Sequence, residues 1–137
     1  MSLVLDASMT TAWLFADERQ AAAHDVLQRV ASEGATVPTF WRLEVANILS
    51  NAVRRLRCDE AYAEVSLARL GRLSITVDAE TDGQAWSRTR ALSLEEGLTA
   101  YDAAYLEMAL RLTLPLASCD AELIAAARRR GVEVFAA

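Results

Sequence analysis

The chain alternates short apolar runs with longer segments of helical periodicity. The apolar runs lie at residues 2–6, 35–37, 74–77, 115–119 and 132–135. Apolar side chains recur at helical spacing over residues 8–16, 17–32, 41–56, 59–70, 80–93, 99–112 and 121–130. Short strands joined through helices imply right-handed crossovers, which make the strands parallel and cover the sheet on both faces. The pattern therefore predicts an α/β fold around a central parallel sheet.

A chain of 137 residues has the length of one domain, which we place at residues 1–137. It is long enough to bury roughly 70% of its unfolded surface. Two helical segments separate the second predicted strand from the third, which is more than a single crossover requires. We therefore expect a helical hairpin over about 41–70 that projects as a lobe.

The composition, 53% hydrophobic and 24% charged, is that of a folded globular protein. Residues 1–6 contain no basic side chain, which argues against a signal peptide. No apolar run reaches the ~18 residues needed to span a bilayer. The two cysteines, Cys58 and Cys119, have no metal-binding spacing and fit a reducing compartment. We expect a cytoplasmic protein that makes no membrane contact.

Four acidic residues, Asp6, Glu44, Asp102 and Asp120, lie where predicted strands end or helices begin. In an open parallel sheet such positions converge on one edge. Carboxylates gathered there without counter-charge repel each other, and a divalent cation is the usual means of neutralising them. The four residues therefore predict a metal-dependent enzyme.

Three of the four acids also have a simpler interpretation, as helix caps. Asp6 and Asp120 stand where a helix N-cap is expected, and Thr99 to Asp102 has the spacing of a capping box. Carboxylates at helix N-termini stabilise by only about 0.3–1 kcal/mol each. Glu44 lies inside a helix beside its apolar face, where capping does not explain it. We favour a shared metal site because the four positions point to the same region.

Four segments carry a resemblance to a known family. They are residues 5–8 (LDAS), 41–47 (WRLEVAN), 99–105 (TAYDAAY) and 116–123 (LASCDAEL). In this order they resemble the PIN domain, most closely the VapC-type toxins of bacterial toxin–antitoxin pairs, over the whole chain. The resemblance implies a three-layer α/β/α sandwich with a parallel sheet. It also implies an endoribonuclease that uses Mg²⁺ or Mn²⁺.

The resemblance places the catalytic acids at Asp6, Glu44, Asp102 and Asp120. We expect Asp6 and Asp102 to bind the metal directly, and Glu44 and Asp120 to act through water or a second ion. Hydrolysis by an activated water would leave a 5′-phosphate and a 3′-hydroxyl. The expected supporting residues are Ser8, Asn47 and Ser118.

The expected partners are RNA, a cognate antitoxin protein and a second copy of the chain as a homodimer. The net charge of −5 opposes RNA binding, so local arginines and the metal must offset it. Arginines cluster at residues 54–57 and 128–130. They fit favourable interactions with helix C-termini, or contacts with phosphate or an acidic partner.

Other functions stay open. Receiver domains and haloacid-dehalogenase-type phosphatases also carry aspartates at strand ends, but both need a lysine, and this chain contains none. A non-catalytic PIN-like module that binds RNA or protein is the main alternative. Such a module would be expected to lack one or more of the four acids.

Overall fold

The computed structural model of the chain describes residues 2–15 and 20–137. Its sheet has five parallel strands in the order β3-β2-β1-β4-β5. The strands are β1 Val4–Leu5, β2 Ala35–Val37, β3 Ile75–Val77, β4 Leu116–Ser118 and β5 Val134–Ala136. The predicted α/β class with a central parallel sheet is confirmed.

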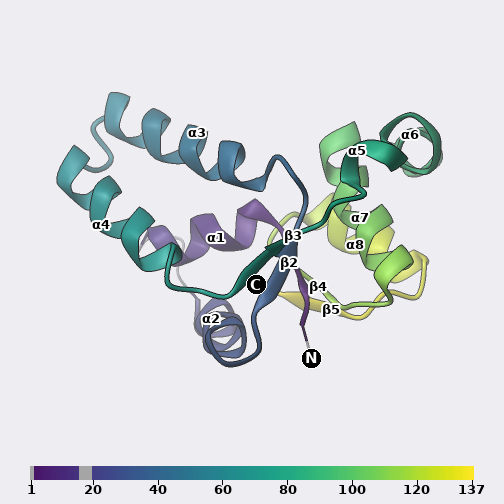
Figure 1. The fold of residues 1–137 in the computed structure, drawn as a ribbon, viewed down its shortest axis with the longest axis horizontal. Helices are drawn as coiled ribbons and strands as arrows, with labels where there is room; N and C mark the ends of the chain where they lie inside the picture. The colour runs from purple at the N-terminus through teal and green to yellow at the C-terminus, as the bar shows by residue number, and fades with distance from the viewer. Residues whose placement is uncertain (1, 16–19) are drawn as a thin grey trace.

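Helices cover both faces of the sheet, as Figure 1 shows. The helices are α1 Ala7–Leu14, α2 Ala21–Glu33, α3 Trp41–Arg54, α4 Glu60–Leu70, α5 Thr81–Gln84, α6 Arg90–Glu96, α7 Ala100–Leu112 and α8 Ala121–Arg129, with a π-helical turn η1 at Ala85–Thr89. Helices α1 and α2 lie on one side, with the α3–α4 hairpin beyond them, and α7 and α8 lie on the other. The three-layer α/β/α sandwich is therefore confirmed.

The core forms around the central strand. Leu3, Val4 and Leu5 are fully buried, as are Leu106 on α7 and Leu116 on β4. A strand buried on both faces is continuously apolar, which explains why residues 3–5 show no alternation. This packing holds the end of β1, and the acid that follows it, at the centre of the sheet.

Three local expectations need correction. The helix predicted over 80–93 is broken into α5, η1 and α6, and the π turn brings Thr89 and Leu92 inward while leaving Trp86 94% exposed. The last strand begins at Val134, two residues later than predicted. Helix α1 begins at Ala7, one residue before the predicted start at Ser8, so Ser8 lies inside the helix and Asp6 holds the N-cap position. Residues 16–19, which were predicted to end the first helix and begin the second, lie outside the described part of the chain.

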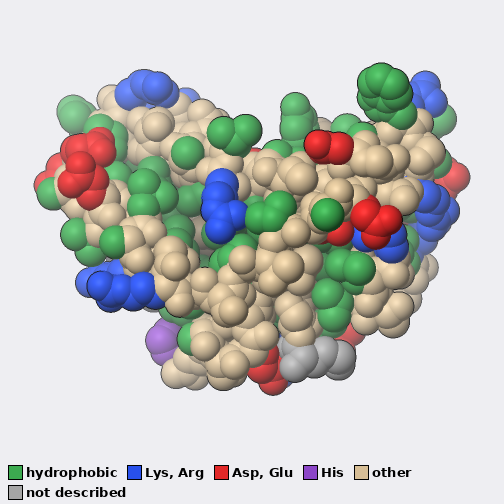
Figure 2. Space-filling view, in the orientation of Figure 1, with side chains coloured by type: hydrophobic (Ala, Val, Ile, Leu, Met, Phe, Trp, Pro, Cys, Tyr) green, Lys and Arg blue, Asp and Glu red, His purple; other side chains and the backbone are tan. Residues whose placement is uncertain are grey.

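The hairpin expected over 41–70 is present as α3 and α4, which contact each other. In the space-filling view, the surface is hollowed between the α3 side and the α5–α6 side (Figure 2). Within residues 2–15 and 20–137, no helix combines the length and apolar character needed to cross a membrane.

Candidate active site

Asp6 lies directly after the central strand, and two serines hold its carboxylate. Its backbone N–H donates to the Ala117 carbonyl oxygen of β4 at 3.0 Å. Its Oδ2 atom accepts hydrogen bonds from Ser8 Oγ at 2.6 Å and Ser118 Oγ at 2.7 Å. The side chain is only 5% exposed, and burial raises its pKa above the usual value despite the two serine hydrogen bonds, with the charge of Asp120 adding to the rise.

The same two serines connect Asp6 to the end of β4. Ser8 Oγ accepts a hydrogen bond from the Cys119 N–H at 2.9 Å, and Ser118 Oγ accepts one from the Asp120 N–H at 3.0 Å. Asp120 caps α8 through its Oδ1 atom, which accepts from the Leu123 N–H at 3.0 Å. Ser8 and Ser118 therefore fix two acids from opposite ends of the sequence in one hydrogen-bonded group.

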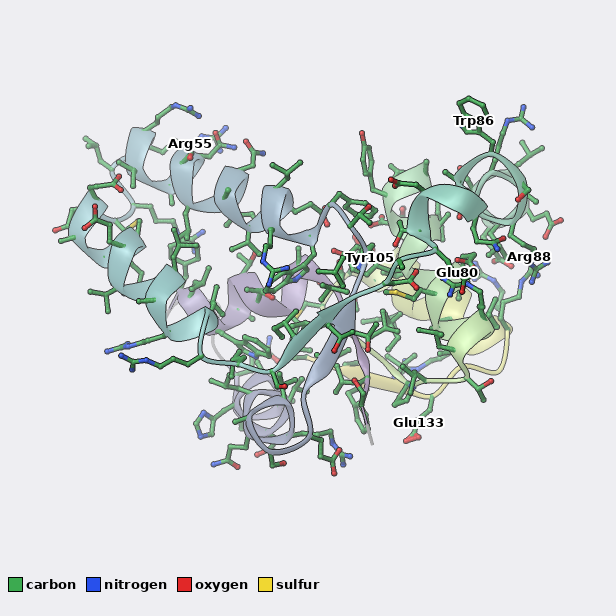
Figure 3. All side chains as sticks on the ribbon, in the orientation of Figure 1. Arg55, Glu80, Trp86, Arg88, Tyr105 and Glu133 are labelled. Carbon is green, nitrogen blue, oxygen red and sulfur yellow. The ribbon has the colours of Figure 1, made fainter. Side chains whose placement is uncertain are left out.

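Glu44 reaches the site from α3, where Tyr105 of α7 holds it. The Tyr105 hydroxyl donates to Glu44 Oε1 at 2.5 Å. Figure 3 shows Tyr105 in the middle of the molecule, between α3 and α7. Burial raises the pKa of Glu44, and the charge of Asp6 raises it further, although the hydrogen bond from Tyr105 opposes both effects. The influence of Asp6 on Glu44 indicates that the two carboxylates are neighbours.

Asp102 lies in the first turn of α7, where its N–H donates to Thr99 Oγ1 at 3.1 Å. Burial raises the pKa of this half-buried carboxyl to about 6, with contributions from the charges of Asp6, Asp120, Glu44 and Glu122. All four acids selected from the sequence thus interact electrostatically. Glu122, in the first turn of α8, adds to their negative potential.

The four carboxylates form no ion pair with any arginine in the described part of the chain. Among the described residues, Asp6 Oδ1, Glu44 Oε2, Asp120 Oδ2 and both side-chain oxygens of Asp102 accept no hydrogen bond. The group therefore combines hard oxygen donors with no protein counter-charge among the described residues, and three of its members, Asp6, Glu44 and Asp102, have raised pKa values. This donor set suits Mg²⁺ or Mn²⁺.

The four carboxylates are not packed as closely as the ligands of a complete metal site. Over residues 2–15 and 20–137, no three His, Cys, Asp or Glu side chains stand close enough together to hold a metal ion. Mutual repulsion between uncompensated carboxylates favours such separation, because each charge lowers its energy by moving apart. Asp6, Glu44 and Asp120 nevertheless each have one carboxylate oxygen that accepts a hydrogen bond from the protein.

Asp78 shows what a purely structural acid at the end of a strand looks like in this fold. It follows β3 as Asp6 follows β1, but Arg111 Nη2 lies 2.6 Å from its Oδ2 atom. Burial alone would raise the pKa of Asp78, yet the hydrogen bonds from Arg111 and the Glu80 backbone, together with the Arg111 charge, lower it. The direction of the pKa shift thus separates Asp78 from Asp6, Glu44 and Asp102.

Asn47 is the one selected residue that the structure does not connect to the others. It is exposed on α3 and makes no hydrogen bond with the described acids. Sequence reasoning missed Tyr105 as a partner of Glu44. A signal was available, because Tyr105 lies three residues after Asp102 and therefore on a neighbouring face of the same helix.

Neutralising Asp102 should remove a pH-dependent destabilisation of the metal-free protein. Because the folded-state pKa is raised from 3.8 to about 6, the ionised carboxylate opposes folding as the pH rises through this window. The full shift corresponds to about 3 kcal/mol, which solvent screening reduces to about 1 kcal/mol for a half-exposed group. In EDTA, the difference in Tm between Asp102→Asn and the wild type should grow by a few degrees in favour of the variant as the pH rises from 4.5 to 7.5. An equal difference at both pH values would contradict this.

Comparisons with known proteins agree with this geometry. The PIN domain family matches residues 3–129. The solved structure of PAE2754 from Pyrobaculum aerophilum is similar over 98% of this chain and 90% of its own, with a TM-score of 0.71 and 25% sequence identity. VapBC2 from Rickettsia felis, solved bound to a promoter DNA fragment, has a TM-score of 0.68 and 13% identity, covering 100% of this chain and 99% of its own.

VapC20 from Mycobacterium tuberculosis, described as a toxin that cleaves the sarcin-ricin loop, has a TM-score of 0.58 and 18% identity over 91% of this chain and 95% of its own. No curated protein sequence matches significantly. The family match covers nearly the whole chain, so this protein belongs to the PIN domain family. The resemblance seen in the sequence is confirmed at that level.

Proposed function

We propose that this protein is a metal-dependent endoribonuclease and the toxin of a toxin–antitoxin pair, built as a single domain. The observation that carries the proposal is a group of four carboxylates that forms no ion pair with any described arginine, and in which burial and neighbouring acidic charges raise the pKa of Asp6, Glu44 and Asp102. Family membership supports it, and the fold of VapC20, described as a toxin that cleaves the sarcin-ricin loop, is similar. A non-catalytic module gains nothing from retaining four mutually repelling acids.

Asp6 and Asp102 would hold Mg²⁺ or Mn²⁺ directly, with Glu44 and Asp120 acting through water or on a second ion. The bound cation would supply a Lewis acid that screens the phosphate and lowers the pKa of water. Ser8 and Ser118 keep Asp6 oriented through their hydrogen bonds to Oδ2. Asp120 has its Oδ1 atom fixed at the start of α8, so Oδ2 can orient the attacking water. In-line attack on phosphorus then releases the 3′ oxygen and leaves a 5′-phosphate.

The proposal is tested by mapping RNA 5′ ends after expression of the wild type and of Asp102→Asn. We expect new 5′-phosphate ends only with the wild type, because the variant lacks a charged metal ligand. Adding EDTA to the purified wild type should abolish cleavage, and Mn²⁺ or Mg²⁺ should restore it. Cuts made equally by both proteins would refute this assignment of the active site.

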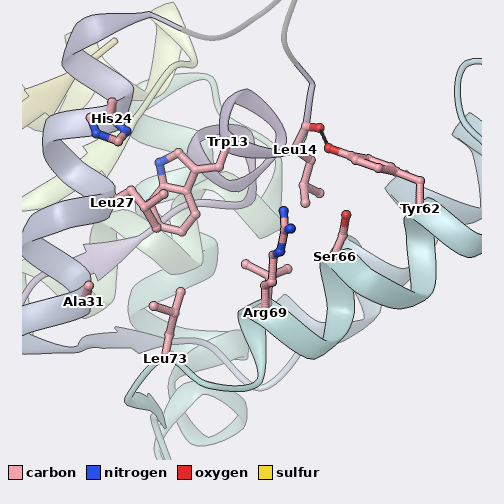
Figure 4. Close-up of a pocket in the computed structure, with 10 residues that line it drawn as sticks. Trp13, Leu14, His24, Leu27, Ala31, Tyr62, Ser66, Arg69 and Leu73 are labelled. Atoms are coloured by element: carbon pink, nitrogen blue, oxygen red, sulfur yellow. Dashed lines mark hydrogen bonds between the residues drawn. The ribbon is translucent and has the colours of Figure 1, made fainter.

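The cognate antitoxin is proposed to dock beside α4, the second helix of the 41–70 hairpin. A pocket of about 430 Å³ opens there between α1, α2 and α4, lined mostly by apolar side chains (Figure 4). Arg69 extends into it from α4, between Trp13 and Ser66. This surface suits an amphipathic segment that also carries an acidic residue.

Charge reversal at Arg69 tests the docking site without touching the four acids. Arg69→Glu should weaken capture of the co-encoded antitoxin in a co-expression pull-down, because an acidic segment would then meet a like charge. RNA cleavage and Tm should stay close to those of the wild type. Unchanged capture of the antitoxin would place its main contacts elsewhere.

The homodimer stays a proposal as well. Large exposed apolar side chains support it, including Trp86 at 94%, Leu94 at 80% and Leu43 at 73% exposure. Figure 3 shows Trp86 at the outer end of the lobe formed by η1 and α6. Sedimentation velocity should give a dimer for the wild type and more monomer for Trp86→Glu. A strict monomer at micromolar concentration would count against the dimer.

The arginine clusters contribute less to RNA binding than their number suggests. Arg129 and Arg130 are committed to ion pairs with Glu96 and Glu95 on α6, at 2.7 Å. Arg54 donates to Asn51, and the Arg57 guanidinium lies 4.1 Å from the ring centre of Phe15. The proposed RNA contact therefore depends on other arginines and on the metal.

A further inference from the structure

Tyr105 is the largest fully buried side chain that contacts one of the four acids. It is 0% exposed, and its hydroxyl donates to Glu44 Oε1 at 2.5 Å. This hydrogen bond links α7, the helix that carries Tyr105, to the acid on α3.

Aromatic packing fixes the position of this hydroxyl. The Phe40 ring meets the Tyr105 ring edge to face, with ring centres 5.6 Å apart and an interplanar angle of 84°. Phe40 immediately precedes α3, the helix that carries Glu44. The donor and the helix that bears its acceptor are thus held against each other by the same contact.

Glu44 needs such a tether because its surroundings otherwise drive it away. It has a flexible side chain, and Asp6 is close enough for its charge to raise the pKa of Glu44. An unrestrained glutamate would rotate toward solvent, where repulsion is weaker and rotamer freedom is retained. The hydrogen bond from Tyr105 to Oε1 restricts this rotation of the Glu44 carboxylate.

We propose that Tyr105 is a positioning residue for the metal site, in which its hydroxyl fixes Glu44 so that one carboxylate oxygen is presented to the cation or to its bound water. This inference rests on the proposed function. Residues around a metal site generally orient the metal ligands through hydrogen bonds. The hydrogen bond from Tyr105 to Glu44 would act in the same way, by orienting Glu44 before the ion binds.

The test compares Tyr105→Phe with a matched control, Tyr101→Phe. Tyr101 also packs edge to face on Phe40, with ring centres 5.3 Å apart, but it is 62% exposed. Tyr105→Phe should raise the Mn²⁺ concentration needed for half-maximal stabilisation by about 10-fold or more. Its kcat for RNA cleavage should fall by a similar factor, with KM for RNA unchanged. Tyr101→Phe should leave all three values at wild-type levels.

A merely structural role for Tyr105 predicts something different. Tyr105→Phe would then lower Tm equally with and without Mn²⁺ and leave the Mn²⁺ midpoint unchanged, which would overturn the proposal. If Tyr105 positions Glu44, the effect of Tyr105→Phe on Mn²⁺ binding should disappear when Glu44 is already replaced by Gln. In that background Tyr105→Phe should change the Mn²⁺ midpoint by less than about 2-fold. An undiminished effect in that background would equally overturn it.

A measurement on the wild type covers the case in which Tyr105→Phe does not fold. The buried Tyr105 hydroxyl proton should give a downfield NMR signal that shifts on saturation with Mg²⁺, whereas no shift at saturation would overturn the proposal. Wild type that neither binds Mn²⁺ nor cleaves RNA would refute the proposed function itself. Wild type that does both, with Tyr105→Phe indistinguishable from it, would refute only this inference.

Discussion

Asp6→Asn is expected to reduce RNA cleavage by roughly 1,000-fold or more, because it removes the most buried of the proposed metal ligands. The neutral amide oxygen can still accept from Ser8 and Ser118, and asparagine is as good a residue as aspartate at a helix N-cap. The fold should therefore survive. The variant should also lose the rise in Tm that Mn²⁺ gives to the wild type.

In EDTA the same variant should be at least as stable as the wild type, because burial of the ionised Asp6 carboxylate raises its pKa and opposes folding. This separates loss of a ligand from loss of structure. Asp25→Asn, an identical change on the exposed face of α2, is the matched control and should cleave normally. If Asp6→Asn retains cleavage within about 10-fold of the wild type, Asp6 is not a direct ligand.

Arg111→Ala should destabilise the protein by about 3–5 kcal/mol, the largest stability effect we expect from one surface-reaching side chain. Arg111 lies 2.6 Å from Asp78 and 2.9 Å from Glu107, and it also reaches Glu80 at 3.3 Å. Asp78 and Glu107 are 8% and 3% exposed, so the variant leaves two buried carboxylates without a counter-charge. Thermal unfolding should occur roughly 10–20 °C lower.

The loss of stability in Arg111→Ala should depend on pH. Arg111 lowers the pKa of Asp78, so the stability from this pair is present above pH 3.8, the ordinary pKa, and is lost as the pH falls through the lower folded-state value. The difference between wild type and Arg111→Ala should therefore shrink below about pH 4. Arg88→Ala, on a neighbouring exposed arginine, should change stability by no more than about 0.5 kcal/mol. A similar loss in both variants would show that the ion pairs are not the cause.

Several features could be predicted because they depend on local pattern. The continuous apolar run before Asp6 and the helical spacing before Gly131 are properties of neighbouring residues, and both gave elements within a few residues of their observed positions. The prediction of one continuous helix over residues 80–93 was wrong because it, too, depended only on local pattern. Its π turn η1 packs against α7, and that contact joins segments too far apart in sequence for a local pattern to reveal it.

The order of residues along the chain determined the alternation of strand and helix, the parallel sheet and the selection of Asp6, Glu44, Asp102 and Asp120. Topology carries this information most directly for Asp6 and Asp120, which follow β1 and β4, because the carboxyl ends of parallel strands lie at the same edge of the sheet. Only the tertiary structure decided which donors hold these acids, and that Asp78 is neutralised by Arg111 while Asp6 is not. Such pairings join residues far apart in sequence, and burial sets their strength. Charge and distance in the folded state therefore distinguish a structural carboxylate from one that is free to bind a cation.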